Sequence, residues 1–434
     1  MKRSWVPPTT WTVLGASAMT TVGILPVFLL SSQSVFVRAD LDFDERRFGV
    51  AVSAFFVAAA ASVLLGGGLV DRWGRRTSTA VAGLLTAAGG FGVAWAARSW
   101  LVLTVAMVIL GVANAACQVT SNVTMAKVVP PHRQGLGFGV KQAAIPLAIT
   151  LAGLAVPTVG ALLGWRWTFA LTGFGGLAIA LVSLRLPSAT VAGSRPLGAL
   201  DRPSTAALVT TMIAVSLASA AGNSLGAFVA SWGFRVGLTP DVAGLLMATG
   251  SAVNLVVRVV SGHLADRRHG RNLPVVAAQM LIGAAALAVL SFPSEPTVVA
   301  AGLIAFAFGW SWPGLLLYAV VRVSRDAPGA ASSYLQAGAF VGGAAGPALF
   351  GAVVAASGYE TAWRVAAMLF AVAALLVIVA RRMFIADLIA RPPVHPIGYG
   401  GGRKAPAYTT PPRRLAQTGE RGSSGTSTVG DASS

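Results

Sequence analysis

Two basic side chains lie deep within apolar stretches of the sequence, where a charge needs a physical reason. Lys141 lies in the apolar stretch 136–163 and Arg258 in the stretch 241–264. A charged side chain at the centre of a bilayer costs about 2.5–3.5 kcal/mol on insertion scales. No Asp or Glu occurs in the interior of these stretches. The pattern therefore predicts that an incoming anion neutralises the two cations, and snorkelling toward lipid headgroups is the alternative.

Polar and aromatic side chains surround both cations in the expected helices. Asn254 precedes Arg258 by one helical turn and shares its face, and Gln142 follows Lys141. Asn114, Gln118 and Asn122 form an amide stripe at helical spacing, and a second polar set follows a similar period at Ser216, Ser219 and Asn223. These faces predict a wet cavity, although amides can also simply hold membrane helices together. The predicted substrate-binding residues are Lys141, Arg258, Asn254, Gln142, Asn114, Gln118 and Trp312.

Composition indicates which elements must position these residues. The 434 residues are 55% hydrophobic and 11% charged, with a mean hydropathy of +0.73, so most of the chain must lie in a bilayer. A membrane-spanning helix needs about 20 predominantly apolar residues, and by this criterion the sequence contains twelve spans. Their approximate limits are 11–30, 48–69, 77–97, 100–125, 136–163, 167–185, 206–230, 241–264, 272–292, 297–321, 329–356 and 361–385.

The spans fall into two groups of six. We expect an N-terminal bundle over 1–185, a cytoplasmic linker over 186–205, a C-terminal bundle over 206–390 and a disordered basic tail over 391–434. The net charge of +18 would suggest nucleic acid in a soluble protein, but here the basic residues lie between apolar runs. Most of them fall on the side of both termini. This asymmetry predicts a multi-pass protein of the cytoplasmic membrane with both termini in the cytoplasm, and no nucleic-acid partner.

One polar phrase occurs twice. "GGGLVDRWGRR" covers residues 66–76 and "SGHLADRRHGR" covers residues 261–271. Gly67 pairs with Gly262 and Asp71 with Asp266, each at an offset of 195 residues. The chain therefore contains a duplicated six-helix unit whose two copies have the same orientation, as in one large class of transporters.

The pattern G-x-L-x-D-R-x-G-R-R after the second span resembles the loop motif of the major facilitator superfamily. The second copy matches this pattern less closely, since His263, Arg268 and His269 depart from it. The resemblance implies an all-α membrane fold of 6+6 helices whose two bundles rock about a central site. It also implies a conformational latch, for which Gly67 and Gly262 would let helices approach closely. The predicted latch residues are Gly67, Asp71, Arg72, Gly74, Arg75, Gly262, Asp266 and Arg267.

The stretch "NLVVRVVSG" resembles the helix-eight region of monocarboxylate transporters and oxalate/formate exchangers, in which an arginine binds the carboxylate. The resemblance extends to Arg258 and Gly262 only. Asn254 stands where monocarboxylate transporters have an aspartate, and the second cation, Lys141, is on helix five rather than helix eleven. We therefore predict a secondary active transporter of a small organic anion. The Arg258 guanidinium would bind both oxygens of a carboxylate, and Lys141 would act as a point charge.

The alternative is a proton-driven exporter of drugs or metabolites. Three absences weigh against it: internal carboxylates, an arginine in "AMVILG" at 106–111, and an intact glycine–proline signature on helix five, where Val156 precedes Pro157. The similar "GGAAGPALFG" at 342–351 is explained by helix bending and close packing. Sugar-porter signatures, a phosphate-binding loop and metal-spaced His or Cys clusters are missing as well. We expect no enzyme activity, cofactor or metal, and a monomer in the lipid bilayer that binds a small molecule, with or without a coupling ion.

Overall fold

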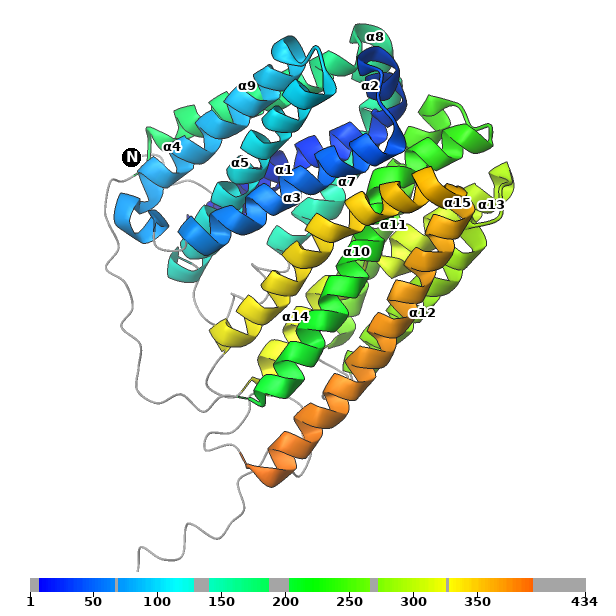
Figure 1. The fold of residues 1–434 in the computed structure, drawn as a ribbon. Helices are drawn as coiled ribbons and strands as arrows, with labels where there is room; N and C mark the ends of the chain where they lie inside the picture. Colours follow the sequence, from blue (N-terminus) through cyan, green and yellow to red (C-terminus); the bar gives the residue numbers. More distant parts are fainter. Residues whose placement is uncertain are drawn as a thin grey trace, which may run out of the picture.

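The computed structural model describes residues 8–66, 69–128, 140–186, 203–265, 272–324 and 328–392, with side chains omitted at 8–9, 64–71, 126–128 and 328–330. The described residues form helices joined by short connections, with no β-strand among them. We number the membrane-crossing segments one to twelve in chain order. Figure 1 shows them as two groups, the N-terminal one in blue to teal and the C-terminal one in green to orange.

Segments one to six form the first group. The long helices here begin and end close to the predicted limits, but segments three and five contain π-helical turns. In chain order the elements are α1 (Pro8–Ser32), α2 (Ser34–Leu41), α3 (Glu45–Gly66), α4 (Leu69–Phe91), η1 (Gly92–Ala96), α5 (Trp100–Val128), α7 (Ala144–Leu154), η2 (Val156–Gly160), α8 (Ala161–Leu163) and α9 (Trp165–Ser183).

Segments seven to twelve form the second group: α10 (Thr205–Val236), α11 (Pro240–Ala265), α12 (Asn272–Leu290), α13 (Glu295–Ile304), η4 (Ala305–Gly309), α14 (Trp312–Val323) and α15 (Pro328–Ala390). The described residues contain 11 helices long and apolar enough to cross a membrane. The last of them reverses direction at Gly358 (φ 84°, ψ 168°), as Figure 1 shows, and so crosses twice. The prediction of twelve spans in an all-α membrane protein is therefore confirmed.

The internal repeat is visible in the backbone as well as in the sequence. Gly164 (φ 91°, ψ 157°) begins segment six, and Gly358 (φ 84°, ψ 168°) begins segment twelve. The two glycines are 358 − 164 = 194 residues apart and have nearly the same conformation. L-residues with a Cβ rarely adopt such positive φ values, so glycine is required at both turns.

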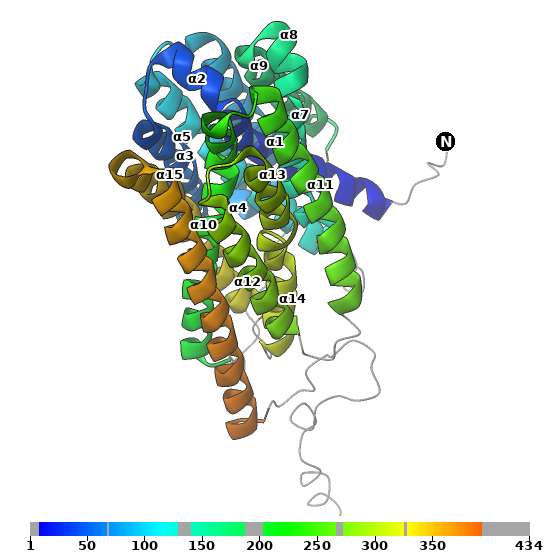
Figure 2. The ribbon, with the colours of Figure 1, turned by 90° about the vertical axis from the view of Figure 1, so that its right-hand side faces the viewer.

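The two bundles contact each other most closely in the half of the molecule away from the termini. There Ser34 and Ser231 are joined by a hydrogen bond of 2.8 Å between their hydroxyls. Nearby, the Ala348 N–H donates to Ser53 Oγ over 2.9 Å. Figures 1 and 2 show the groups converging at the end that carries α2, α8 and α13. We call this end the distal face, and the end nearest the termini the terminal face.

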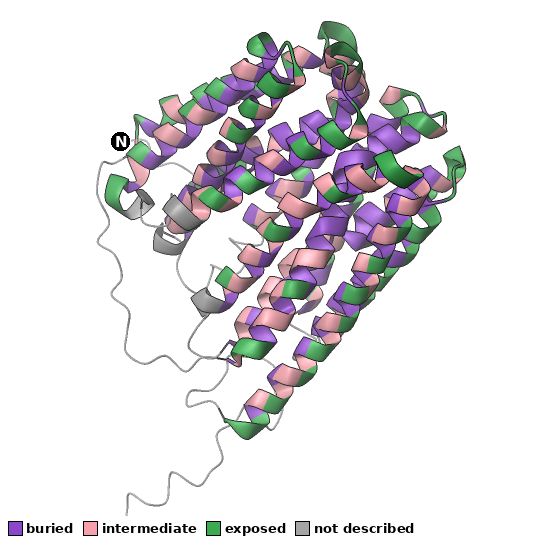
Figure 3. Ribbon diagram, in the orientation of Figure 1, coloured by how far each residue is buried: buried purple, intermediate pink, exposed green. Residues whose placement is uncertain are grey.

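One hydrophobic core runs through both bundles. Phe48 of α3 and Phe228 of α10 meet across the interface with ring centroids 5.2 Å apart in an edge-to-face arrangement. Figure 3 shows buried residues on the helix faces that meet and exposed residues on the outside, where lipid would lie. The bundles are therefore packed as one body in this conformation.

Much of the predicted linker and tail lies outside the described residues. Segment seven begins at Thr205, with Ser204 Oγ accepting a 3.5 Å hydrogen bond from the Ala207 N–H as an N-cap. Segment twelve continues to Ala390. The division into domains at 185, 206 and 390 remains a prediction.

Candidate functional site

Arg258 lies where the two bundles meet and bonds to both of them. Its Nη2 donates to the main-chain oxygen of Trp310 over 2.6 Å, within its own bundle. Its Nη1 reaches the main-chain oxygen of Gln142 in segment five over 3.4 Å. One guanidinium therefore links segments five, eight and ten.

Segment ten offers the Trp310 oxygen because its helix is interrupted. The π-helical η4 is followed by Trp310 and Ser311, which lie outside the helix, and α14 then begins at Trp312. Pro313 has no N–H to continue the helical ladder and favours the start of a new helix. Asn254 Nδ2 donates to the carbonyls of Phe306 (2.7 Å) and Ala307 (3.3 Å). Asn254 and Arg258 thus share a face, as predicted, and together they bind the broken stretch.

We expect Asn254→Leu to destabilise the C-terminal bundle by about 1–3 kcal/mol, the usual cost of leaving buried polar groups unpaired. Leucine has nearly the same size but cannot donate to the Phe306 and Ala307 carbonyls. The matched control is Asn223→Leu, because Asn223 Nδ2 donates (2.8 Å) to Ser219, a carbonyl inside the regular helix α10. Thermal unfolding in detergent measures both variants. Equal losses of stability in the two variants would show that Asn254 does not stabilise the interruption in segment ten.

The described partners of Arg258 are all uncharged, so none of them neutralises its positive charge. The two carbonyls are uncharged, and Arg258 Nε is buried without a hydrogen-bond partner in the described structure. The Trp310 carbonyl follows the C-terminal end of α13–η4, where the helix dipole favours a cation. The Asp and Glu residues of the described part lie at the ends of membrane helices or in connections. Arg258 is therefore a largely enclosed guanidinium whose described partners carry no negative charge.

Lys141 lies in a separate environment within the N-terminal bundle. Its Nζ donates to Gln118 Oε1 over 2.6 Å and to Asn122 Oδ1 over 2.7 Å, and the residue is only 2% exposed. The amide stripe of α5 thus holds the cation of segment five. The third amide, Asn114, is buried and its Oδ1 has no described partner. Gln142, the neighbour of Lys141, contributes its main-chain oxygen rather than its side chain.

Trp310 lies at the interface between the bundles. The Trp310 ring contacts Phe28 of α1 edge-to-face, with centroids 5.7 Å apart. A Cβ placed on Gly226 of α10 would lie 2.8 Å from the same ring. Trp312 is 2% exposed and its Nε1 has no described partner. The sequence analysis selected Trp312 and not Trp310, and a role for Trp312 in binding stays a prediction.

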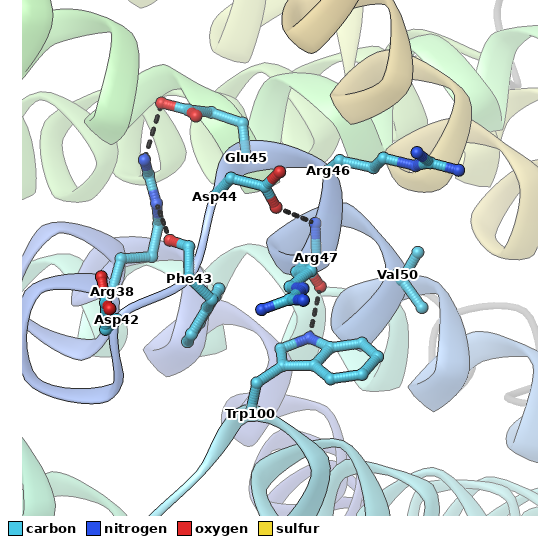
Figure 4. Close-up of a pocket in the computed structure, with 9 residues that line it drawn as sticks. All are labelled: Arg38, Asp42, Phe43, Asp44, Glu45, Arg46, Arg47, Val50 and Trp100. Carbon is cyan, nitrogen blue, oxygen red and sulfur yellow. Dashed lines mark hydrogen bonds and ion pairs between the residues drawn. The ribbon is translucent and has the colours of Figure 1, made fainter.

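Charged residues of the segment 38–47 make a further cluster at the distal face, which the sequence prediction did not select. Figure 4 shows the recess that they line. Arg38 forms an ion pair of 2.7 Å with Glu45, and its Nε donates to the Phe43 carbonyl over 3.3 Å. Trp100 Nε1 donates to the Arg47 carbonyl over 2.8 Å. The run "RADLDFDERR" was the sequence sign of this cluster.

The same segment closes the distal face against the other bundle. A Cβ on Gly351 would lie 2.6 Å from the Glu45 carbonyl, and one on Gly49 would lie 2.3 Å from the Pro347 carbonyl. Gln33 is fully buried here, and neither polar atom of its side chain has a described partner. Backbones this close can approach only where side chains are absent. We call this set of contacts, with the Ser34–Ser231 bond, the distal gate.

The predicted latch is described only in part. Arg72 is exposed, Arg75 is partly buried, and Gly74 has φ 75° and ψ 168°, a turn that needs glycine. Gly262 does not serve a close helix contact here, because a Cβ on it would meet nothing within 4 Å. That part of the prediction is wrong in this conformation. Gly67, Asp266, Arg267 and the side chain of Asp71 lie outside the described residues.

Comparison with known proteins gives a consistent family. The family model described as "Major Facilitator Superfamily" matches residues 11–327 and 205–417. The chloramphenicol resistance protein of Streptomyces lividans is 29% identical over 337 residues, which are 74% of this chain and 83% of that protein. The inner membrane transport protein YdhP of Escherichia coli strain K12 is 25% identical over 382 residues, 85% of this chain and 93% of that protein.

Solved structures agree at the level of the fold. A bacterial homolog of the human lysosomal transporter Spinster, inward-facing and occupied, has a TM-score of 0.71 with 16% identity and covers 88% of this chain and 99% of its own. A D-xylose–proton symporter has a TM-score of 0.71 with 17% identity, covering 85% of this chain and 97% of its own. These relatives do not confirm the resemblance to carboxylate transporters. They and the family model show that the chain is a multi-pass membrane transporter, not an enzyme, and that it belongs to the major facilitator superfamily.

Proposed function

We propose that the protein carries a small organic anion across the cytoplasmic membrane by alternating access, with Arg258 as the group that binds the anion. The observation that carries the proposal is the position of Arg258. It bonds to both bundles, its described partners are neutral carbonyls, and its Nε is unused. A carboxylate would supply two oxygens to this fork and neutralise its charge.

Binding would also change the contacts of segment ten. A carboxylate that accepts from Nε and from one Nη2 hydrogen would compete with or reorient the bond from Nη2 to the Trp310 carbonyl, while Asn254 keeps its bonds to Phe306 and Ala307. Because Arg258 also reaches Gln142, the ligand would act on the interface between bundles. A ligand shifts a conformational equilibrium only through such differences between states.

Topology and assembly complete the proposal. The excess of Lys and Arg on the side of the termini supports a cytoplasmic position for the terminal face. The contacts of the distal gate then close the outer side, and the site is reached from the cytoplasm. One chain contains both bundles and the interface between them, which supports a functional monomer.

The test is thermal stabilisation of the purified protein by a panel of small mono- and dicarboxylates, with neutral and cationic compounds alongside. A ligand that binds the folded state raises its apparent stability. We expect carboxylates to stabilise the wild type and to bind Arg258→Gln about 10- to 100-fold more weakly, the loss of a charge-assisted pair. Arg235→Gln, at the exposed end of α10, is the matched control. Equal carboxylate binding by Arg258→Gln would contradict the assignment.

A second candidate is export of chloramphenicol-like compounds, favoured by the 29% identity over 83% of the Streptomyces lividans resistance protein. Chloramphenicol has no carboxylate, so its nitro oxygens would be the acceptors for Arg258. Expression in a sensitive host decides between the candidates. A rise in the tolerated chloramphenicol concentration would favour this exporter. Loss of that rise in Arg258→Gln would make Arg258 the group that binds the nitro oxygens, and its persistence would make Arg258 structural.

A further inference from the structure

We propose that Lys141 is a proton-binding group of the transport cycle, held by Gln118 and Asn122 so that it can exchange its third proton with water. The inference deepens the proposed function, on which it rests, by naming the proton as the coupling ion. It starts from a count of hydrogen bonds. The ammonium form has three N–H groups, but the described structure offers two acceptors, at 2.6 and 2.7 Å.

The neutral amine fits this environment better than the ammonium. An amine has two N–H groups, which match the two amide oxygens, and a lone pair that can take up a proton from water. Buried polar hydrogens are normally all bonded, and the ammonium would leave one without a described partner. A guanidinium such as Arg258 stays protonated under ordinary conditions, whereas a lysine amine exchanges its proton.

One partner of Lys141 lies at the surface of the described structure. Lys141 itself is 2% exposed, but its partner Asn122 is exposed. The transfer balances simply: the ammonium breaks one N–H bond, gives H⁺ to a water molecule near Asn122, and keeps its electron pair as the lone pair of the amine. The reverse step reloads it.

The other titratable or charged groups near Lys141 are few. α1 carries none over its described side chains, and α5 carries Cys117, which is fully buried. The side chain of Lys127 lies outside the described residues. α11 packs against α7 and carries Arg258, with Asp241 and His263 near its two ends. No carboxylate is therefore available in the described surroundings to bind the proton in place of Lys141.

Arg258 connects this proton to the substrate. Its Nη1 contacts the carbonyl of Gln142, the residue next to Lys141. Both groups add positive charge to the region where segments five and eight meet, and an anion bound to Arg258 lowers the combined charge there. The anion then favours the proton on Lys141, and by reciprocity the proton favours the anion. Anion and proton are thus expected to travel in the same direction.

The first experiment observes the amine directly. The chain has only four lysines, Lys2, Lys127, Lys141 and Lys404. Replacing the other three with arginine leaves Lys141 alone, so NMR of protein with ¹³C,¹⁵N-lysine in nanodiscs reports its protonation without altering the site. We expect one signal that converts from ammonium to amine as the pH rises, and whose midpoint moves once Arg258→Met removes one positive charge. A signal that stays protonated throughout, or ignores Arg258→Met, overturns the proposal.

The second experiment asks whether the proton changes the conformation. Spin labels at Thr77→Cys and His263→Cys, exposed positions of the two bundles near the terminal face, report their separation. Because the neutral amine fits the described conformation, raising the pH from about 6 to about 9 should increase that population at least about threefold. Lys141→Met should abolish the response, and Lys404→Met should keep it.

A full response in Lys141→Met would overturn the proposal. If that variant does not fold, Gln118→Leu, which removes one acceptor of Lys141, must alter the response instead. Neither experiment uses a substrate. Failure here therefore leaves the anion proposal standing, and failure of the carboxylate screen leaves the Lys141 measurements valid.

Discussion

Replacing Gly49 with leucine is expected to shift the transporter away from the conformation described here without unfolding either bundle. A Cβ at position 49 would lie 2.3 Å from the Pro347 carbonyl of the other bundle. The obstacle is backbone, which cannot move aside like the end of a flexible side chain. The substitution therefore prevents closure of the distal gate, while the helices inside each bundle keep their partners.

The measurement uses a cysteine at Ser34, a fully buried gate residue in contact with Ser231. Cys117, the native cysteine, is also fully buried and should react little. We expect a membrane-impermeant maleimide to label Ser34→Cys at least about tenfold faster when Gly49→Leu is present, since the open state then dominates. Gly15→Leu is the control, because a Cβ there meets nothing within 4 Å. Unchanged labelling would show that the gate closes by another route.

Replacing Gly342 with leucine is expected to disrupt the C-terminal bundle itself. A Cβ at this position would lie 2.1 Å from the Ser216 carbonyl and 2.7 Å from Ser219 Cβ, both on α10. Gly338 and Gly346 face α10 in the same way, with Cβ positions 2.5 Å from the carbonyls of Met212 and Ala220, so relief would require the helices to separate along their length. We expect a loss of at least about 3 kcal/mol, at the upper end for overpacking.

Yield of monodisperse protein and the midpoint of thermal unfolding measure the effect. Gly314→Leu, in the same bundle with open space around its Cα, should behave like the wild type. A variant with normal stability would mean that α10 and α15 are less tightly packed than their backbones indicate. Together, Gly49 and Gly342 separate contacts between bundles from contacts within one.

The fold followed from patterns that are local in the sequence. Apolar length predicted the spans, and the repeat offset predicted equivalent halves, which the matching turns at Gly164 and Gly358 confirm. The glycine-rich stretch at 342–351 was correctly explained by close packing. Helical spacing also placed Asn254 and Arg258 on one face, where both contact segment ten.

The hydrogen-bond partners of Lys141 and Arg258 were harder to predict from the sequence. Lys141 and the amide stripe were each noted, but nothing in the spacing shows that Gln118 and Asn122 point at Lys141 rather than at the cavity. The oxygens that bind Arg258 belong to the main chain, which every residue carries. Which carbonyl is free depends on where a helix breaks, and the π-helical turn before Trp310 has no simple signature. Whether Lys141 and Arg258 act on substrate stays a prediction.

The break in segment ten makes the two halves of the molecule mechanically unequal. Its repeat equivalent, α5, is one continuous helix of 29 residues, which moves as one rigid element across the membrane. Segment ten instead consists of two shorter helical pieces, α13 continued by η4 and then α14, which are separated by Trp310 and Ser311. Movement at the distal face therefore reaches the terminal face directly through the N-terminal half. In the C-terminal half, part of the same movement is absorbed as bending at that joint, beside Arg258.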